Sequence, residues 1–307
     1  MSTIKIDNSP VSDFSDEKLI AWMQSTKGGY KLQKKVASIW VAIFRSLLQQ
    51  GPPMTVRGLF YNCENVYHVV KKSAGGYKQV QRQVLAMRRA GVLPYSFISD
   101  LTRWVRKPVT YSGLRACLEH TKEAYRRALW DDQKDYVLVF CEKDAIAGIL
   151  YDITEEWDVR LLVVRGYASE TFAYTAAELI KSQNKPAYAY YFGDWDKHGV
   201  QISNDLERKL AEFGAKVHFE RVAVHAWQIF DWKLPTRPTK DPGWGECVEI
   251  DAIPANKLRE LVEDCILRHI DQGELQQTLR IEELEREGLE IVFNNMGLAP
   301  HSDKGAS

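Results

Sequence analysis

The sequence lacks the features that mark secreted and membrane proteins. Its five cysteines are odd in number and form no CxxC pair, which disfavours a disulfide framework or a zinc site and favours free thiols in a reducing compartment. No apolar run approaches the length of a membrane span, and no signal peptide is visible at the N-terminus. No Gly-rich nucleotide-binding loop indicates an ATPase. We therefore expect a cytoplasmic protein with no membrane partner.

The charges are divided unevenly along the chain. The 307 residues are 45% hydrophobic and 27% charged, which allows two domains with cores of their own, and the formal net charge is zero. Residues 1–134 contain 22 basic and 10 acidic residues, a net charge of +12, so the remainder has 19 basic and 31 acidic residues and −12. This asymmetry predicts a front half that meets a polyanion.

The front half shows helical spacing with a basic surface. Residues 16–49 have helical periodicity broken near Gly28, and Thr55 is a candidate N-cap for a helix that extends to about Val70. A second helix is predicted over Tyr77–Ala90, with Val80, Val84, Leu85 and Met87 inward, and a β-rich or irregular segment over Val92–Lys107. This order is typical of a winged helix-turn-helix, and an ordinary helical subdomain with a basic surface is the alternative. The residues predicted to contact DNA are Lys78, Arg82, Arg88, Arg89, Arg103, Arg106 and Lys107.

The back half alternates between strand and helix patterns. The predicted strands are Val137–Phe140, Arg160–Val164, Ala187–Phe192 and Val217–Val224, and the predicted helices between them are Ala145–Glu156, Ser169–Ser182 and Val200–Phe213. Such alternation predicts an α/β fold with a mostly parallel sheet covered by helices on both faces. Two further helices are predicted over Lys257–Ile270 and Glu274–Asn295, after an irregular loop at Leu234–Lys240.

The patterns together predict five segments. The expected division is a helical N-terminal segment at 1–50, a winged-helix domain at 51–107, a linking helix at 108–134, an α/β domain with a C-terminal helical extension at 135–297, and a disordered tail at 298–307.

Three carboxylates follow two of the predicted strands. Glu142 comes just after the first strand, and Asp194 and Asp196 come just after the third. Because parallel strands end at one edge of a sheet, the three side chains are expected to converge there and to need a cation. Hard oxygen ligands favour Mg²⁺, or Mn²⁺ in its place, next to a nucleic acid phosphate.

Other readings of these acids remain open. Glu142 is also a candidate general acid or base, and an Asp-x-Asp-x-x-Gly motif by itself is often a turn with capping carboxylates. Lys197 and His198 either touch the phosphate or are solvated loop residues. The preceding glutamate, at this separation and in this topology, favours the cation site.

Arg57 and Tyr61 lie upstream, at the start of the basic region. They are four residues apart and share a face if this segment is helical. A tyrosine beside an arginine in a DNA-binding module is a candidate nucleophile toward a phosphodiester, because the arginine favours the phenolate and the phosphate charge. The alternative is a tyrosine that only packs with Phe60 in the helix core.

The motifs resemble those of a known family. The Glu142-Lys-Asp sequence followed by Asp194-x-Asp196-x-x-Gly199 resembles the Toprim domain, a nucleotidyl-transfer module of topoisomerases, primases and some nucleases. Together with Thr55-x-Arg57-x-x-Phe-Tyr61, and with Val248–Ile253 ahead of a helix, it resembles the topoisomerase VI A subunit and its meiotic relatives that make double-strand breaks. The resemblance covers roughly residues 50–270, and with the Leu234–Lys240 loop the chain looks most similar to the short, stand-alone bacterial and phage members.

This resemblance implies a Mg²⁺-dependent protein that cleaves double-stranded DNA as a nucleoid-associated homodimer. It implies that Tyr61 attacks to form a 5′-phosphotyrosyl link, that Arg57 assists, and that the three carboxylates of the partner chain hold the metal. Strand passage would require a separate ATPase subunit. Gly58 replaces an acidic residue of the family pattern, and Lys197 replaces a proline. A hydrolytic Toprim nuclease in which Tyr61 only packs, and a non-catalytic DNA-binding protein, are the alternatives.

Overall fold

Helical and strand patterns along the chain produce a mixed α/β structure. The computed structural model describes residues 5–6, 9–10, 14–28, 31–99, 108–239, 241 and 243–295. The chain divides into two units by its contacts. The first unit comprises residues 1–103 and 136–268, and the second comprises residues 104–135 and 269–307.

The N-terminal part of the first unit is helical, apart from a two-residue strand pair. Its elements are β1 (Lys5–Ile6), β2 (Ser9–Pro10), α1 (Asp16–Thr26), α2 (Lys34–Gln50), α3 (Val56–Tyr61), a π-helical turn (Asn62–Val66), α4 (Ala74–Arg89) and a 3₁₀ turn (Tyr95–Phe97). Thr55 caps α3 as predicted, because its hydroxyl accepts a hydrogen bond from the Gly58 N–H at 2.8 Å. The helical conformation ends at Val66, earlier than the predicted end at Val70.

Helix α4 has one apolar face, which is narrower than predicted. Val80, Val84 and Met87 are buried, but Leu85 is 43% exposed, so the prediction that it faces inward was wrong. Each residue advances about 100° around a helix, so Leu85 lies about 100° away from Val84 and outside the buried face. In the predicted β-rich segment, residues 92–99 contain a turn and a single bridge between Met54 and Ile98. The rest of that segment, 100–107, lies outside the described residues.

A four-stranded parallel sheet organises the remainder of the first unit. Its strands are β3 (Tyr136–Cys141), β4 (Arg160–Val163), β5 (Ala187–Phe192) and β6 (Val217–Ala223). They lie in the order β4-β3-β5-β6, and all neighbours are parallel, as predicted. All six residues of β3 are buried, because helices cover both faces of a central strand. Cys141 pairs with Phe192, so β3 and β5 end at the same level.

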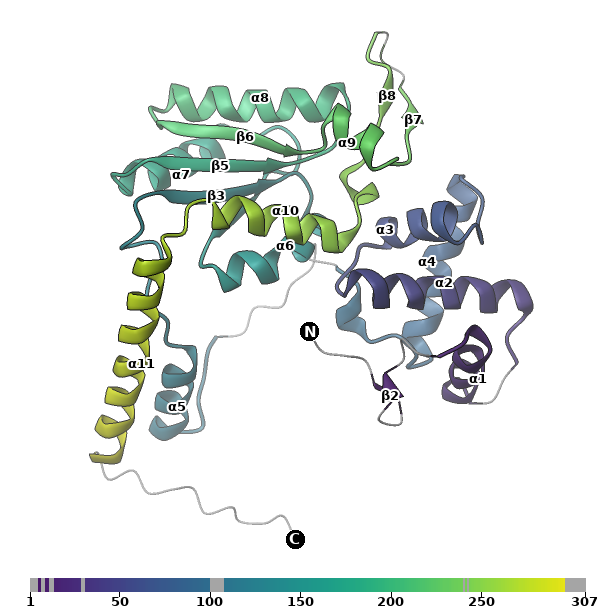
Figure 1. Ribbon diagram of the computed structural model, residues 1–307, viewed down its shortest axis with the longest axis horizontal. Helices are drawn as coiled ribbons and strands as arrows, with labels where there is room; N and C mark the ends of the chain where they lie inside the picture. The colour runs from purple at the N-terminus through teal and green to yellow at the C-terminus, as the bar shows by residue number, and fades with distance from the viewer. Residues whose placement is uncertain are drawn as a thin grey trace. The chain divides into compact units, whose positions relative to one another are not determined.

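Two pairs of helices enclose the sheet (Figure 1). Helix α6 (Asp144–Glu156) packs against α10 (Ala255–Leu267) on one face, and α7 (Glu170–Ser182) packs against α8 (Lys197–Glu212) on the other. Right-handed crossovers explain this division. The chain crosses the sheet in one direction from β3 to β4 and in the opposite direction from β4 to β5 and β6, so the connecting helices lie on opposite faces. Helices α6 and α8 both begin at the carboxyl edge of the sheet, directly after β3 and β5.

The segment after β6 runs across that edge. It contains α9 (Ala226–Asp231), a short antiparallel pair of β7 (Arg237–Pro238) with β8 (Glu246–Cys247), and a 3₁₀ turn (Ile250–Ala252). Strand β7 lies within the loop that was predicted to be irregular. Val248 forms a backbone bridge with Trp195, whose N–H and carbonyl both bond to it, at 2.8 and 2.9 Å. This bridge fixes the segment to the loop that follows β5.

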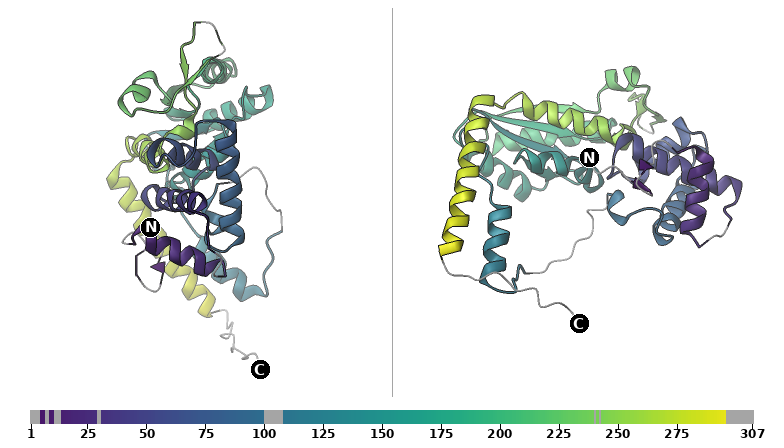
Figure 2. Two further views of the ribbon diagram at one scale, coloured as in Figure 1. Left: turned by 90° about the vertical axis from the view of Figure 1, so that its right-hand side faces the viewer. Right: turned by 60° about the horizontal axis from the view of Figure 1, so that its bottom comes forward.

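The second unit contains a pair of helices, α5 (Leu114–Ala124) and α11 (Gln272–Asn295), which lie side by side in both views of Figure 2. Ion pairs join them, with Lys122 Nζ 2.7 Å from a Glu290 oxygen and Arg127 2.8 Å from Glu285. The linking helix predicted within residues 108–134 comprises Leu114–Ala124. In the part of the chain that the structure describes, no helix has both the length and the apolar character that crossing a bilayer requires.

Two leucine substitutions test this assignment of core and surface. Leu138→Ala in β3 should lower the free energy of unfolding by about 3 kcal/mol, because a fully buried side chain leaves a cavity. Leu85→Ala, at a position 43% exposed, should lower it by about 1 kcal/mol or less. Urea denaturation followed by circular dichroism measures both values, and equal losses would contradict the assignment.

Candidate functional site at the carboxyl edge of the sheet

The ends of β3 and β5 bring Glu142 and Asp194 into direct contact. The Glu142 N–H donates to the Phe192 carbonyl at 2.9 Å, which continues the strand pairing one residue beyond β3. The Asp194 N–H then donates to Glu142 Oε2 at 3.0 Å. Burial, and then the charge of Asp194, raise the pKa of the Glu142 carboxyl. The fold therefore places two like charges together at a site with little water.

Two glycines allow the tight loop between β5 and α8. A Cβ on Gly193 would lie 2.6 Å from the Tyr191 ring and 2.7 Å from Glu142 Oε2. A Cβ on Gly199 would lie 2.3 Å from the Asp194 carbonyl oxygen. Neither distance accommodates a side chain, so both positions require glycine for close approach of the backbone.

Asp196 has a local structural role in this arrangement. It is the N-cap of α8, and its Oδ1 accepts a hydrogen bond from the Gly199 N–H at 2.7 Å. Its Oδ2 lies 3.8 Å from the Arg237 guanidinium. Among the described residues, no three His, Cys, Asp or Glu side chains are grouped closely enough to hold a metal ion in this arrangement. The structure thus brings Glu142 and Asp194 together, with Asp196 beside them at the helix start.

Lys143 supplies the positive charge at this edge, a role that the sequence analysis did not assign. Its ammonium lies 2.8 Å from Asp194 Oδ2 and 3.4 Å from Asp251 Oδ2. Burial alone would lower the pKa of Lys143, but the charges of Asp194 and Asp251 outweigh that effect and raise it. The only sequence signal was its position directly after Glu142, at a strand end.

Two further acids come from the segment after β8. Glu249 and Asp251 are buried, with exposed fractions of 7% and 6%. The Thr55 hydroxyl donates to Asp251 Oδ1 at 2.7 Å, and the Ile250 N–H donates to Asp194 Oδ1 at 2.9 Å. The sequence analysis noted this segment only through its resemblance to a family. Through Asp251 and the Ile250 N–H, this segment joins the start of α3 to the loop that follows β5.

Arg57 links the candidate tyrosine to this cluster. Its guanidinium Nε lies 3.0 Å from Glu249 Oε2, and its guanidinium lies over the Tyr77 ring, 4.7 Å from the centroid. Arg57 and Tyr61 both lie on α3, as predicted.

Tyr61 itself is half-buried and packs against Phe60, with ring centroids 5.5 Å apart. Burial and the charge of Glu249 raise the pKa of Tyr61 to about 12, although Arg57 opposes them. Tyr61 is therefore a neutral phenol near neutral pH.

Two more arginines hold the loop in place. Arg237, on β7, lies 3.4 Å from Glu249 Oε1, and its other terminal nitrogen faces Asp196. Arg221 is directed at the backbone, and its guanidinium donates to the carbonyl oxygens of Gly193 and Gly199 at 3.0 and 3.1 Å. Burial lowers the pKa of Arg221. The shape of the Asp194–Asp196 loop therefore depends on residues that are distant in sequence.

The predicted DNA-contacting residues occupy different environments. Lys78, Arg82 and Arg89 are exposed on α4. Arg88 is turned toward the following turn, where it donates to the Tyr95 carbonyl at 3.2 Å and lies over the Tyr95 ring. Arg103, Arg106 and Lys107 lie outside the described residues. The structure therefore presents three of the seven as solvent-facing cations on one helix.

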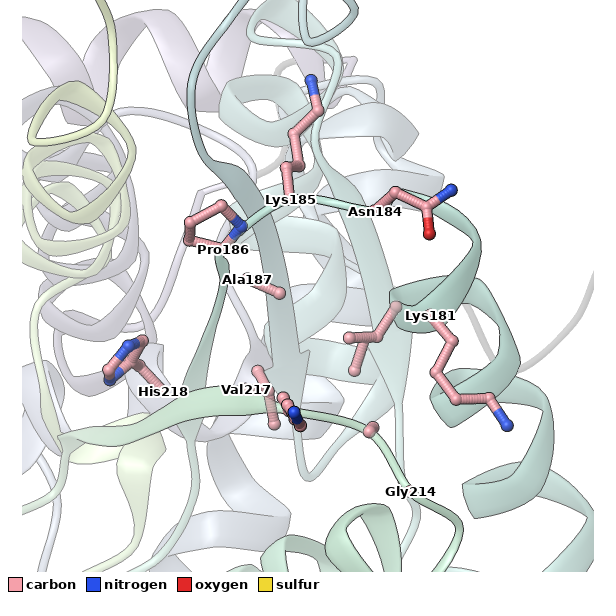
Figure 3. Close-up of a pocket in the computed structure, with 11 residues that line it drawn as sticks. Lys181, Asn184, Lys185, Pro186, Ala187, Gly214, Val217 and His218 are labelled. Carbon is pink, nitrogen blue, oxygen red and sulfur yellow. The ribbon is translucent and has the colours of Figure 1, made fainter.

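A hollow at the opposite end of the strands is separate from this cluster (Figure 3). It is lined by the residues that begin β5 and β6, Ala187 and Val217, and by the ends of α7 and α8. Lys181 and Lys185 extend away from one another at its rim. Because parallel strands place their catalytic residues at the carboxyl ends, this hollow is not part of the candidate site.

The carboxylates at the carboxyl edge are of the ligand type that suits a hard divalent cation, but among the described residues they are not grouped closely enough to hold one in this arrangement. Glu142, Asp194 and Asp196 supply only oxygen atoms, and a backbone N–H orients one oxygen of each carboxylate. The Lys143 ammonium occupies the position beside Asp194 that a cation would take. Binding of a cation there therefore requires the ammonium to shift toward Asp251. Burial, and after it repulsion from Asp194, raises the pKa of the Glu142 carboxyl, and a bound cation would relieve the repulsion.

Replacement of Lys143 tests its role as the internal counter-charge. Lys143→Met should lower the free energy of unfolding by about 3 kcal/mol, because it removes the ammonium that neutralises the buried carboxylates of Asp194 and Asp251. The matched control is Lys197→Met, since Lys197 is exposed and lies 3.8 Å from Asp241, and it should cost about 0.5 kcal/mol or less. Chemical denaturation measures both, and a neutral Lys143→Met would exclude this role.

The pKa of Tyr61 predicts a dependence of stability on pH. The folded pKa of about 12 lies above the unfolded value of 10.0, so the contribution of Tyr61 is complete below pH 10 and is lost as the pH rises to 12. Relative to Tyr61→Phe, the wild type should lose about 1 kcal/mol over this range, after allowance for solvent screening. Denaturation at pH 9, 10, 11 and 12 measures the difference. Tyr174→Phe, on the exposed side of α7, should follow the wild type.

Comparison with known proteins assigns no role to the residues of this site. No protein-family model matches the chain, and no curated protein matches it with significance. The conclusions about the site therefore depend on the distances, burial and charges of its own residues.

Proposed function

We propose that the protein binds DNA and cleaves it in a Mg²⁺-dependent reaction, with a winged-helix module and a Toprim domain similar to those of the topoisomerase VI A subunit. The observation that carries this proposal is a pair of ion-pair clusters in the first unit, which the 249–251 segment joins. Arg57 contacts Glu249, two residues from Asp251, and Asp251 shares Lys143 with Asp194. The helix that bears the candidate nucleophile thus belongs to the same charged cluster as the candidate metal ligands.

The proposed reaction is a transesterification. The Tyr61 hydroxyl oxygen attacks phosphorus, the bond from phosphorus to the 3′ oxygen of the preceding nucleotide breaks, and the phenol proton leaves to an acceptor while the 3′ oxygen gains one. The products are a 5′-phosphotyrosyl protein and a free 3′ hydroxyl. The cation, held by Glu142, Asp194 and Asp196, would neutralise the charge that develops on the phosphate.

The residues of the chain have distinct parts in this scheme. Tyr61 must lose its proton during attack, because its pKa of about 12 keeps it neutral at the start. Arg57 is bound to Glu249 before DNA is present, and a phosphate would compete with Glu249 for its guanidinium. The exposed cations of α4, Lys78, Arg82 and Arg89, would contact the DNA backbone.

Cleavage of both strands requires two nucleophiles, which supports a homodimer as the active form. In that assembly each chain supplies one tyrosine, as in the family that the motifs resemble. Passage of a second duplex through the break would need energy from a separate ATPase subunit. The proposed activity of this chain is therefore the cleavage step.

A hydrolytic nuclease is the second candidate, and one observation favours it. Tyr61 packs against Phe60 and has a raised pKa, both of which are typical of a structural tyrosine. In this alternative, water attacks the phosphate at the same carboxylates and leaves free ends. The metal ligands keep their roles, and only the nucleophile differs.

Plasmid cleavage by matched variants separates the two candidates. Supercoiled plasmid is incubated with Mg²⁺ or Mn²⁺ and with wild type, Tyr61→Phe, Asp194→Asn or the control Tyr67→Phe, then denatured with and without protease. Transesterification predicts protein attached to 5′ ends in the wild type and the control, and a loss of at least about 1000-fold in both other variants.

The outcomes are distinct for each candidate. Free ends made equally by wild type and Tyr61→Phe, but not by Asp194→Asn, would establish the hydrolytic reaction and exclude the first proposal. DNA binding without cleavage in either metal would exclude both. Circular dichroism of each variant confirms that a lost activity reflects chemistry rather than unfolding.

A further inference from the structure

An aromatic groove lies beside the carboxylate cluster, and no step proposed above uses it. It has a volume of about 990 Å³ and lies among the Asp194–Asp196 loop, α9 and the β7–β8 pair. This volume is at the upper end of the range for small-molecule sites. Its apolar lining comes from Trp195, Ile229, Phe230, Leu234 and Trp244.

The walls of the groove present flat aromatic surfaces to solvent. Trp195 and Trp244 are adjacent, with ring centroids 5.6 Å apart and planes inclined by 46°. Phe230, on α9, is 84% exposed, the highest value among the large apolar residues that the structure describes. Exposed aromatic rings are unfavourable in water, and a planar ligand that covers them would gain both burial and stacking.

The groove shares one residue, Trp195, with the loop that carries the candidate metal ligands. Trp195 lies between Asp194 and Asp196 in the sequence, and its two backbone bonds to Val248 fix its position. A nucleobase that stacks on Trp195 would therefore contact the loop that bears both acids.

The charges around the groove favour a base over a phosphate. Asp231 and Glu246 line it together with one cation, Lys233, so a phosphate inside would meet a net negative charge. A neutral base carries N–H groups, which donate hydrogen bonds that such carboxylates accept. Arg237 is half-exposed on β7, beside Asp196, and supplies a positive charge for the backbone at the entrance.

We propose that this groove binds an unpaired nucleobase of the DNA substrate, next to the phosphate that the carboxylate cluster engages. Bases inside a continuous duplex are stacked on both faces and cannot reach Trp195, so the base enters from a single-stranded, gapped or unstacked region. The inference rests on the proposed function, and it gives the protein a preference for DNA with unpaired nucleotides. Sequence tolerance follows, because every base has a π-face.

Binding in EDTA tests the groove separately from cleavage. A fluorescein-labelled single-stranded oligonucleotide and the matching duplex are titrated with wild type, Trp195→Ala, Phe230→Ala and the control Tyr174→Ala, and anisotropy gives each Kd. We expect Trp195→Ala and Phe230→Ala to weaken single-strand binding about tenfold, which is typical of loss of one stacking contact, and to leave duplex binding unchanged. Tyr174→Ala, at an exposed position of α7, should bind both DNAs as the wild type does.

The results have separate meanings for the two proposals. Phe230 is highly exposed, so its variant folds even if Trp195→Ala does not, and unchanged single-strand binding by Phe230→Ala would overturn the inference. A change in the sedimentation mass of Phe230→Ala would also overturn it, by showing that a second protein chain covers the groove. If the protein does not cleave plasmid but the groove variants still weaken single-strand binding as expected, only the catalytic proposal is rejected.

Discussion

The structure depends on the neutralisation of buried negative charge at the carboxyl edge of the sheet. Acids from two strand ends and from the 249–251 segment converge there. Buried charges of one sign without a counter-charge are strongly unfavourable. Lys143 lies between Asp194 and Asp251, and Arg57 and Arg237 both contact Glu249. These pairs connect β3, β5, α3 and the β7–β8 segment, so the same interactions assemble the first unit and shape its candidate site.

The like charges at this edge are also the basis of the proposed reaction centre. A carboxylate whose pKa is raised by burial and by a neighbouring acid, such as Glu142, releases free energy when a cation binds. Arg57 is paired with Glu249 on the same helix as Tyr61, and burial, followed by the charge of Glu249, raises the pKa of Tyr61 and keeps its phenol protonated. Stability and proposed chemistry thus use the same charges, and the aromatic groove beside them supplies apolar contact that the cluster lacks.

Much of the fold was predictable because it follows from local sequence. The apolar runs marked β5 to the residue, and β3 to within one residue at each end, since central strands of a parallel sheet are buried on both faces. Thr55 was correctly predicted to cap a helix, because a cap needs only a hydroxyl and the first turn. Leu85 was misassigned, because periodicity locates a helix face only to within a residue.

The sequence by itself determined the α/β alternation, the common edge for Glu142 and Asp194, and the shared helix of Arg57 and Tyr61. Only the tertiary structure decided which charges meet, because Arg57 and Glu249 are 192 residues apart and no local pattern joins them. It also placed Lys143 against Asp194, Asp196 at the N-cap of α8, and Trp195 in the lining of a groove. Propensity and spacing act over a few residues, whereas pairing of buried charges depends on how distant segments pack.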